Sequence, residues 1–202
     1  MAIVEPVEVG EGVAVTEAVP RAVLLVEGMS DRFALEVLAR RRGRDLAAEG
    51  VRVVAMGGAT SIGHFLDRYG PAGLDIRLAG LYDVAEERFV QRGLQRAGLG
   101  AGLSRPQLEA LGFFVCSADL EDELIRALGP ERVEQIVAAE GELRSFRTLQ
   151  RQPAQRERSL HDQLRRLMGG RSGGKLRYAR LMAEAIDLDR VPRPLIAVLD
   201  HI

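Results

Sequence analysis

Residues 23–31 read VLLVEGMSD, an apolar run followed by an acid, a glycine and, three residues further on, a second acid. The continuous apolar run at 22–26 is typical of a strand that is covered on both faces, as in a parallel sheet. Ser30 can cap a helix whose apolar positions, among them Phe33 and Leu38, follow the spacing of one helical face. A strand, a Glu-Gly turn and an amphipathic helix together indicate the start of a βαβ unit.

The same alternation of short apolar runs and helical patterns continues to about residue 128. Further strands are expected at 51–55, 76–82 and 112–116, further helices at 60–69, 86–97 and 119–128, and a glycine-rich loop at 98–105. Short strands that alternate with helices indicate a mostly parallel sheet.

From Pro130 onward the patterns are helical, and no convincing strand is found. We therefore expect three parts: an N-terminal arm (1–20), an α/β core (21–128) and a helical C-terminal part (129–202) packed on the core. The arm is acidic and rich in Val and Ala, so we expect it to be poorly ordered or to pair with a sheet edge.

Composition narrows the class of protein. Apolar residues make up 47% of the 202 residues and charged residues 28%, which is the balance of a soluble globular protein. The net charge of −1 excludes a chain-wide attraction for nucleic acid, so any basic surface has to be local. The single cysteine, Cys116, excludes an internal disulfide and a zinc-finger framework. No apolar run is long enough to span a membrane and no signal peptide is present, so a cytoplasmic protein is expected.

Carboxylates follow three of the predicted strands. Glu27 and Asp31 follow the first strand, Asp83 follows the third, and Asp119 and Glu121 follow the fourth. Ligands of parallel α/β sheets bind at the carboxyl ends of the strands, so these side chains are expected at one edge of the sheet. Converging carboxylates repel one another unless a cation lies between them. Mg²⁺ or Mn²⁺, hard ions that prefer oxygen ligands, suit such a site.

Each of these residues also has a purely structural interpretation. Glu27 could belong to an ordinary strand-to-helix turn, and Asp31 and Glu121 could be first-turn acids that favour the helix dipole. Asp119 could serve only as the N-cap of its helix. Lys175, the one lysine of the chain, could be a solvated helix residue.

Four segments, in this order, resemble a known family. Residues 23–31 resemble the first motif of a Toprim domain, and the form Glu-Gly-x-Ser-Asp resembles that of the OLD (overcoming lysogenization defect) family nucleases. Residues 80–83 (GLYD) resemble the second motif, 118–122 (ADLED) a later acidic segment, and 174–179 (GKLRYA) a downstream helix that contains a lysine. The resemblance covers about residues 21–200. It implies an α/β Toprim (Rossmann-like) fold, with a mostly parallel sheet flanked by helices and a helical C-terminal extension.

The resemblance also implies roles for the acids. Glu27 and Asp83 would hold one divalent metal, and Asp31 and Glu121, with Asp119 nearby, would hold a second. Two such metals can stabilise both the attacking and the leaving oxygen of a phosphodiester displacement.

Two catalytic roles follow from the same resemblance. Lys175 would stabilise charge on the phosphate or on the leaving oxygen. Glu27 could act as a general acid or base instead of a metal ligand, as the corresponding glutamate does in topoisomerases and primases.

The sequence departs from the family pattern in two places. The second motif is normally Asp-x-Asp, but here Ala85 stands where the second aspartate is expected. OLD proteins carry an ATPase domain ahead of the Toprim domain, and these 202 residues leave no room for one, so a stand-alone Toprim protein is expected.

A basic segment supplies candidate nucleic-acid contacts. Residues 144–180 contain eleven Arg/Lys and two acids. Arg165, Arg166, Arg171 and Arg177 are the candidates, because a guanidinium group can bind phosphate through two hydrogen bonds. The alternative is a solvated helical surface. Aromatic residues are not interleaved with the arginines, which argues against sequence-specific reading of single strands.

These observations predict a metal-dependent nuclease or nickase that uses Mg²⁺ or Mn²⁺. The expected partners are nucleic acid (DNA in preference to RNA), a separate ATPase subunit and a second copy of the chain in a homodimer, but no membrane. One alternative is a non-catalytic Toprim module that binds nucleic acid or an ATPase partner. A small-molecule phosphotransferase or phosphatase on the same scaffold is another.

Overall fold

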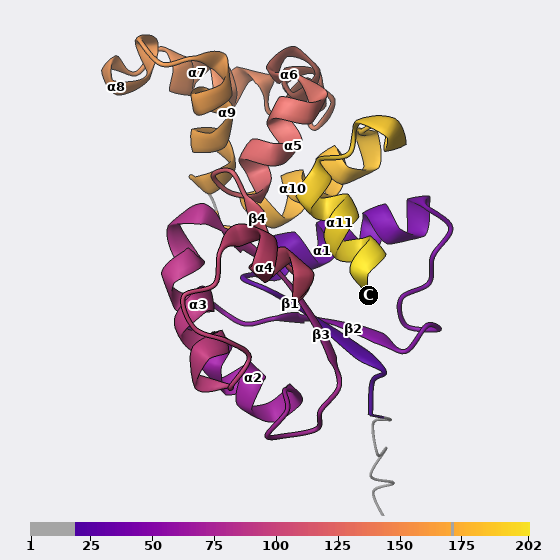
Figure 1. The fold of residues 1–202 in the computed structure, drawn as a ribbon. Helices are drawn as coiled ribbons and strands as arrows, with labels where there is room; N and C mark the ends of the chain where they lie inside the picture. Colours follow the sequence, from indigo (N-terminus) through magenta and orange to yellow (C-terminus); the bar gives the residue numbers. More distant parts are fainter. Residues whose placement is uncertain (1–18, 171) are drawn as a thin grey trace, which may run out of the picture.

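The computed structural model describes residues 19–170 and 172–202, so nearly all of the predicted N-terminal arm lies outside the described residues. A four-stranded parallel sheet forms the centre of the molecule (Figure 1). Its strands are β1 (Ala22–Val26), β2 (Val51–Ala55), β3 (Arg77–Asp83) and β4 (Phe113–Cys116). The predicted parallel α/β architecture is thereby confirmed.

The strand order is β2-β1-β3-β4, with β1 paired to both β2 and β3. After β2 the chain returns across β1 and continues on its other side, so the direction of winding reverses between β1 and β3. In open α/β sheets the carboxyl ends of the strands at such a reversal form the ligand-binding crevice. The register pairs Asp83 with Cys116, which brings the ends of β3 and β4 level.

Helices cover both faces of the sheet. Helices α2 (Ile62–Tyr69) and α3 (Glu87–Arg96) lie on one face, over Val23 and Leu25 of β1. Helices α1 (Met29–Arg41), α10 (Gly174–Ala185) and α11 (Arg193–His201) lie on the other face, over Leu24 and Val26 (Figure 1). Alternate residues of β1 thus enter different cores, and this is why the strand is apolar throughout.

Five helices follow β4 before the chain returns to the sheet: α5 (Leu120–Leu128), α6 (Pro130–Ala139), α7 (Leu143–Gln150), α8 (Pro153–Arg156) and α9 (Leu160–Gly169). Helix α10 then returns to the sheet and packs against both α1 and α5. Phe146, Leu164 and Tyr178 are fully buried in the same apolar cluster as β1 and α1. The core and the helical part therefore share one continuous apolar interior.

Local details differ from the sequence predictions. The N-cap of α1 is Gly28 and not Ser30, and the carboxylate of Asp31, at the third position of the helix, accepts the Gly28 N–H as in the reciprocal half of a capping box. A 3₁₀ turn (Ala59–Ser61) precedes α2, so its N-cap is Ser61 and not Thr60.

The glycine-rich loop is followed by a helix that the sequence did not predict, α4 (Arg105–Ala110). The Ser104 N–H donates to the side chain of Gln107 (2.9 Å) at its start. A second 3₁₀ turn (Val84–Glu86) separates β3 from α3, and a third (Leu188–Arg190) precedes α11. No helix in the described part of the chain is long and apolar enough to cross a membrane.

Candidate active site

The end of β1 carries the first two predicted site residues. The carbonyl oxygen of Glu27 accepts N–H groups from Gly57 (3.0 Å) and Gly58 (3.2 Å), which fixes the turn against the end of β2. Asp31 lies in the first turn of α1, and its Oδ2 accepts the Gly28 N–H at 2.8 Å. Backbone contacts thus hold both residues at the carboxyl edge of the sheet.

Asp83 ends β3, beside the end of β1. Burial, together with the negative charges of Asp31 and Glu27, raises its pKa to about 8. Burial likewise raises the pKa of Asp31 to about 6, against the opposing effect of the Gly28 hydrogen bond. Within residues 19–170 and 172–202 neither carboxylate forms an ion pair, so no side-chain cation offsets the cost of burying its charge.

The turn after β4 presents Asp119 and Glu121. Oδ1 of Asp119 caps α5 by accepting the Asp122 N–H (2.8 Å), as the sequence predicted, while its Oδ2 pairs with Arg165. Glu121 is only 3% exposed. Its Oε2 accepts a hydrogen bond from Lys175 Nζ at 3.3 Å, and its buried Oε1 has no hydrogen-bond partner among the described residues.

The acids of the three strand ends affect one another electrostatically. The pKa of Asp83 is raised by Asp31, Glu27, Asp119 and Glu121, in that order after burial. Burial also raises the pKa of Glu121, with Lys175 opposing it. The structure thus brings all five predicted acids into one electrostatic neighbourhood.

The spacing of these acids is wider than that of a formed metal site. No three Asp, Glu, His or Cys side chains of the described residues lie close enough together to hold a metal as they stand. The chemistry of the donors nevertheless fits a hard divalent cation, since all are carboxylates and the buried Oε1 of Glu121 lacks a partner. Two of the carboxylates form ion pairs with side-chain cations instead: Asp119 with Arg165, and Glu121 with Lys175.

One further acid was not among the predicted site residues. Burial is the main cause of the raised pKa of Glu27, and the negative charge of Glu86 is the next largest. Its neighbour Glu87 instead pairs with Arg105 (3.0 Å), away from the site. The 3₁₀ turn after Asp83 sets this difference. From the sequence, Glu86 and Glu87 are equal candidates to replace the missing motif aspartate, since neither lies at the motif position.

The predicted nucleic-acid contacts divide into two groups. Arg165 and Arg166 line a cavity of about 310 Å³ together with Asp119, Glu121 and Lys175. Arg177 faces another way: it pairs with Glu142 and lies 4.9 Å from the centre of the Tyr178 ring. Arg171 lies outside the described residues. The roles of these arginines remain predictions.

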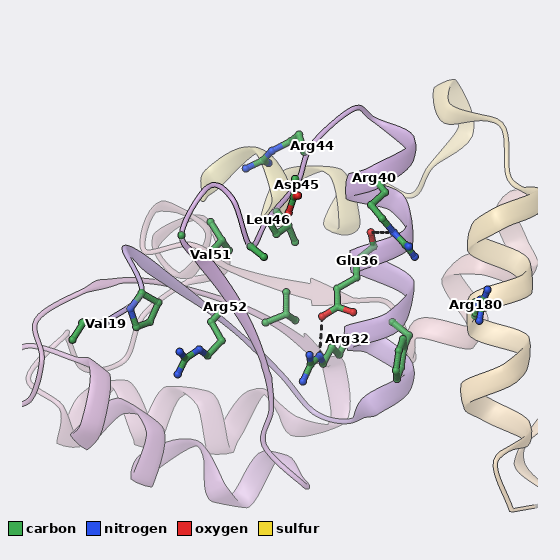
Figure 2. A pocket seen from close by; sticks show the side chains of 15 residues that line it. Val19, Arg32, Glu36, Arg40, Arg44, Asp45, Leu46, Val51, Arg52 and Arg180 are labelled. Atoms are coloured by element: carbon green, nitrogen blue, oxygen red, sulfur yellow. Dashed lines mark hydrogen bonds and ion pairs between the residues drawn. The ribbon is translucent and has the colours of Figure 1, made fainter. Parts of the chain in front are cut away.

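A larger cavity lies elsewhere. Its volume is about 660 Å³. Figure 2 shows the side chains that line it, between the outer side of α1 and the start of β2. It contains none of the predicted site residues, and Arg32 at its wall is paired with Glu36 (2.8 Å). We therefore place the candidate active site at the carboxylate edge and not in the larger hollow.

Comparisons with known proteins agree with this geometry. Residues 20–84 match the family model "Overcoming lysogenization defect protein-like, TOPRIM domain". This stretch contains β1 to β3, with Glu27, Asp31 and Asp83. This segment is therefore similar to an OLD-like Toprim domain.

Solved structures extend the likeness beyond the Toprim segment. The C-terminal region of the Xanthomonas campestris pv. campestris OLD protein is 27% identical, with a TM-score of 0.72 over 91% of this chain and 92% of that chain. A second structure of the same region gives 26% identity and a TM-score of 0.70, covering 90% of this chain and 94% of that chain. The C-terminal region of the Burkholderia pseudomallei OLD protein, at 22% identity and a TM-score of 0.68 over 90% and 96%, shows the shared fold.

The search of curated proteins found no match. The OLD-like Toprim resemblance predicted from the sequence is confirmed by the family model and by these structures. Toprim domains generally bind divalent metals, and the OLD family acts on nucleic acid.

Proposed function

We propose that this OLD-like Toprim protein is a metal-dependent endonuclease or nickase that hydrolyses DNA phosphodiester bonds with Mg²⁺ or Mn²⁺. The observation that carries the proposal is the convergence of carboxylates from three strand ends at the β1–β3 reversal. One of them, Glu121, is buried, and its Oε1 has no hydrogen-bond partner among the described residues. A buried carboxylate oxygen without a partner is costly, and a cation would relieve that cost.

The carboxylates divide into two sets of ligands. Glu27 and Asp83, from the ends of β1 and β3, would hold one ion, and Asp31 and Glu121, with Asp119, would hold a second. When bound, such ions polarise the phosphate and make water a better nucleophile. The protein keeps the donors in place through the Gly28 hydrogen bond to Asp31 and the capping role of Asp119.

Lys175 and Glu27 are the proposed catalytic residues. Lys175 is close enough to affect the pKa of both Glu27 and Glu121, so its ammonium group can reach a phosphate bound between them. There it would stabilise negative charge on the phosphate or the leaving oxygen. Glu27 has a raised pKa and is the candidate general acid or base if it does not bind metal.

Arginines of the helical part would hold the DNA backbone. Arg158, Arg165 and Arg166 face the same 310 Å³ cavity as Asp119 and Glu121, so a phosphate held there would be adjacent to the metal ligands. We accordingly propose that residues 21–128 supply the metal ligands, and that residues 129–202 supply cations for phosphate.

The test is cleavage of supercoiled plasmid with Mn²⁺ or Mg²⁺, which separates nicking from double-strand cutting. We expect the wild type to cleave and Glu121→Gln to be slower by about a hundredfold or more, because a buried ligand is lost. Glu131→Gln is the matched control, since Glu131 is an exposed acid of α6 outside the site. A wild type that cleaves no nucleic acid with either metal contradicts the proposal.

A second candidate is a non-catalytic Toprim module that binds nucleic acid or a separate ATPase subunit. The exposed Ala85, at the position of the second motif aspartate, favours it. An active nuclease should gain rate from Ala85→Asp but not from Ala85→Asn, whereas a binding module should gain activity from neither. Sedimentation of the chain alone would test the expected homodimer in the same preparation.

A further inference from the structure

We propose that metal and phosphate binding are coupled by an exchange of partners at Asp119 and Glu121. Without metal these acids hold Arg165 and Lys175, and metal binding releases both cations toward phosphate. Since a metal must bind for the exchange to occur, it depends on the function proposed above. It adds that the metal switches on the phosphate-binding surface as well as the chemistry.

Two ion pairs join α5 to the helices that follow it. Arg165 of α9 pairs with Oδ2 of Asp119, and Lys175 of α10 pairs with Oε2 of Glu121 at 3.3 Å. The other oxygen of Asp119 is committed to the Asp122 N–H as the helix cap. A metal that binds Asp119 without crowding the cap is best placed at Oδ2, the oxygen that Arg165 now holds.

The carboxylates are fixed, but the cations are able to move. Glu121 is buried and Asp119 is anchored by its cap, whereas the side chain of Lys175 is 56% exposed and that of Arg165 is 34% exposed. Long cationic side chains at a surface change conformation at little cost. A divalent ion at the carboxylates would repel both, so the cations are the groups that leave.

The released cations have a defined place to go. The 310 Å³ cavity is lined by Arg158 and Arg166 as well as by the two exchanging cations. Without metal, Asp119 and Glu121 repel a phosphate in the same cavity, and two of its four cations are occupied. With metal bound, Asp119 and Glu121 are neutralised, so all four cations face the cavity and Asp162 is the one acid of its lining that keeps its charge. The inference is therefore positive coupling between metal and phosphate, which must be reciprocal.

The decisive comparison is Arg165→Gln against Arg166→Gln. The residues are neighbours on α9, line the same cavity and lose the same charge, but only Arg165 contacts an acid of the metal set. In calorimetric titrations with Mn²⁺ alone, we expect Arg165→Gln to bind Mn²⁺ about fivefold more tightly than wild type, since its competitor is gone. Arg166→Gln should bind Mn²⁺ within about twofold of wild type.

Binding of a short DNA duplex gives the second readout. Wild-type affinity for the duplex, measured with Ca²⁺ in place of Mn²⁺ to limit cleavage, should rise when metal is added. This rise should be smaller in Arg165→Gln. In Asp119→Asn, which keeps the helix cap, adding Arg165→Gln should no longer tighten Mn²⁺ binding. Thermal melting of each variant confirms that it folds.

The outcomes separate the two proposals. If wild type binds Mn²⁺ but Arg165→Gln and Arg166→Gln bind it equally, the exchange is overturned and the nuclease proposal stands. If wild type binds no Mn²⁺, with or without DNA, the proposed function fails and the exchange fails with it. Tightening in Arg165→Gln that persists in the Asp119→Asn background also overturns the exchange, because the effect then arises from general charge.

Discussion

The acids at the carboxyl edge of the sheet form two groups, and the cost of bringing their negative charges together is reduced differently in each. In the β1–β3 half, Asp31 and Asp83 form no ion pair with any described residue, and burial raises their pKa values to about 6 and about 8. In the β4–α5 half, Asp119 pairs with Arg165 and Glu121 with Lys175. In one half burial and repulsion shift the carboxyl groups toward the protonated form, and in the other half side-chain cations offset the negative charges.

This difference teaches what a metal would have to displace. At Asp83 the competitor is a proton, so binding there should depend on pH. At Asp119 the competitor is a guanidinium group supplied by the helical part of the chain, so binding there should depend on Arg165.

The largest expected effect is on catalysis and compares one acid from each half. Asp83→Asn should slow Mn²⁺-dependent plasmid cleavage by about a hundredfold or more, because β3 supplies no other carboxylate ligand at the motif position. Asp119→Asn should slow it by only about tenfold, since one Asp119 oxygen is already committed to the helix cap. Initial rates at saturating metal measure both, and the reverse order would break the comparison.

The next effect is on stability without metal. The folded-state pKa of Asp83, about 8, lies above its ordinary value of 3.8, so the protonated form favours folding. Wild-type stability should consequently fall as pH rises from 4 through 8, and Asp83→Asn should escape this loss. We expect a gain for Asp83→Asn on the order of 1–3 kcal/mol at pH 9 and none at pH 4, measured by urea unfolding with chelator present.

Asp119→Asn is the control from the other half. It keeps the N-cap but loses the partner of Arg165, so it should be slightly less stable than wild type, by about 1 kcal/mol or less. If the stability of Asp83→Asn and that of Asp119→Asn depend on pH in the same way, the two groups of acids do not differ as described.

A third effect is proton release. Binding of Mn²⁺ at neutral pH should release about one proton, mainly from Asp83, and the release should disappear above pH 9, where that carboxyl is already ionised. Calorimetry in buffers of different ionisation enthalpy measures the number directly. In Asp83→Asn the release should fall to the small share that Asp31 contributes. Undiminished release in this variant would show that the protons come from elsewhere.

The smallest effect concerns the arginines. Arg177 is held by Glu142 and lies against Tyr178, whereas Arg166 faces the cavity beside Lys175. Arg166→Gln should weaken DNA binding several-fold at low salt, and Arg177→Gln by less than about twofold. Fluorescence anisotropy at several salt concentrations tests this, and equal losses would show that Arg177 also reaches the backbone.

Much of the fold could be predicted because its signals are local. The apolar run of β1, the turn at Glu27 and the cap at Asp119 each depend on residues within one or two turns of chain. The carboxyl edge followed from the general rule for parallel sheets, so the positions of Asp31, Asp83 and Glu121 near one another were expected before the fold was known. The small helix α4 was missed because a single capped turn after a glycine-rich loop has no apolar period to detect.

What the sequence by itself determined is the sheet, its acidic edge and the basic character of the later helices, since strand and helix periodicity and charge are properties of neighbouring residues. Only the tertiary structure decided that Arg165 and Lys175 reach Asp119 and Glu121, that Glu86 approaches Glu27 while Glu87 turns away, and that Arg177 is held by Glu142. These pairings join residues far apart in the chain. They depend on how α9 and α10 pack against α5 and α1, and no local pattern encodes that packing.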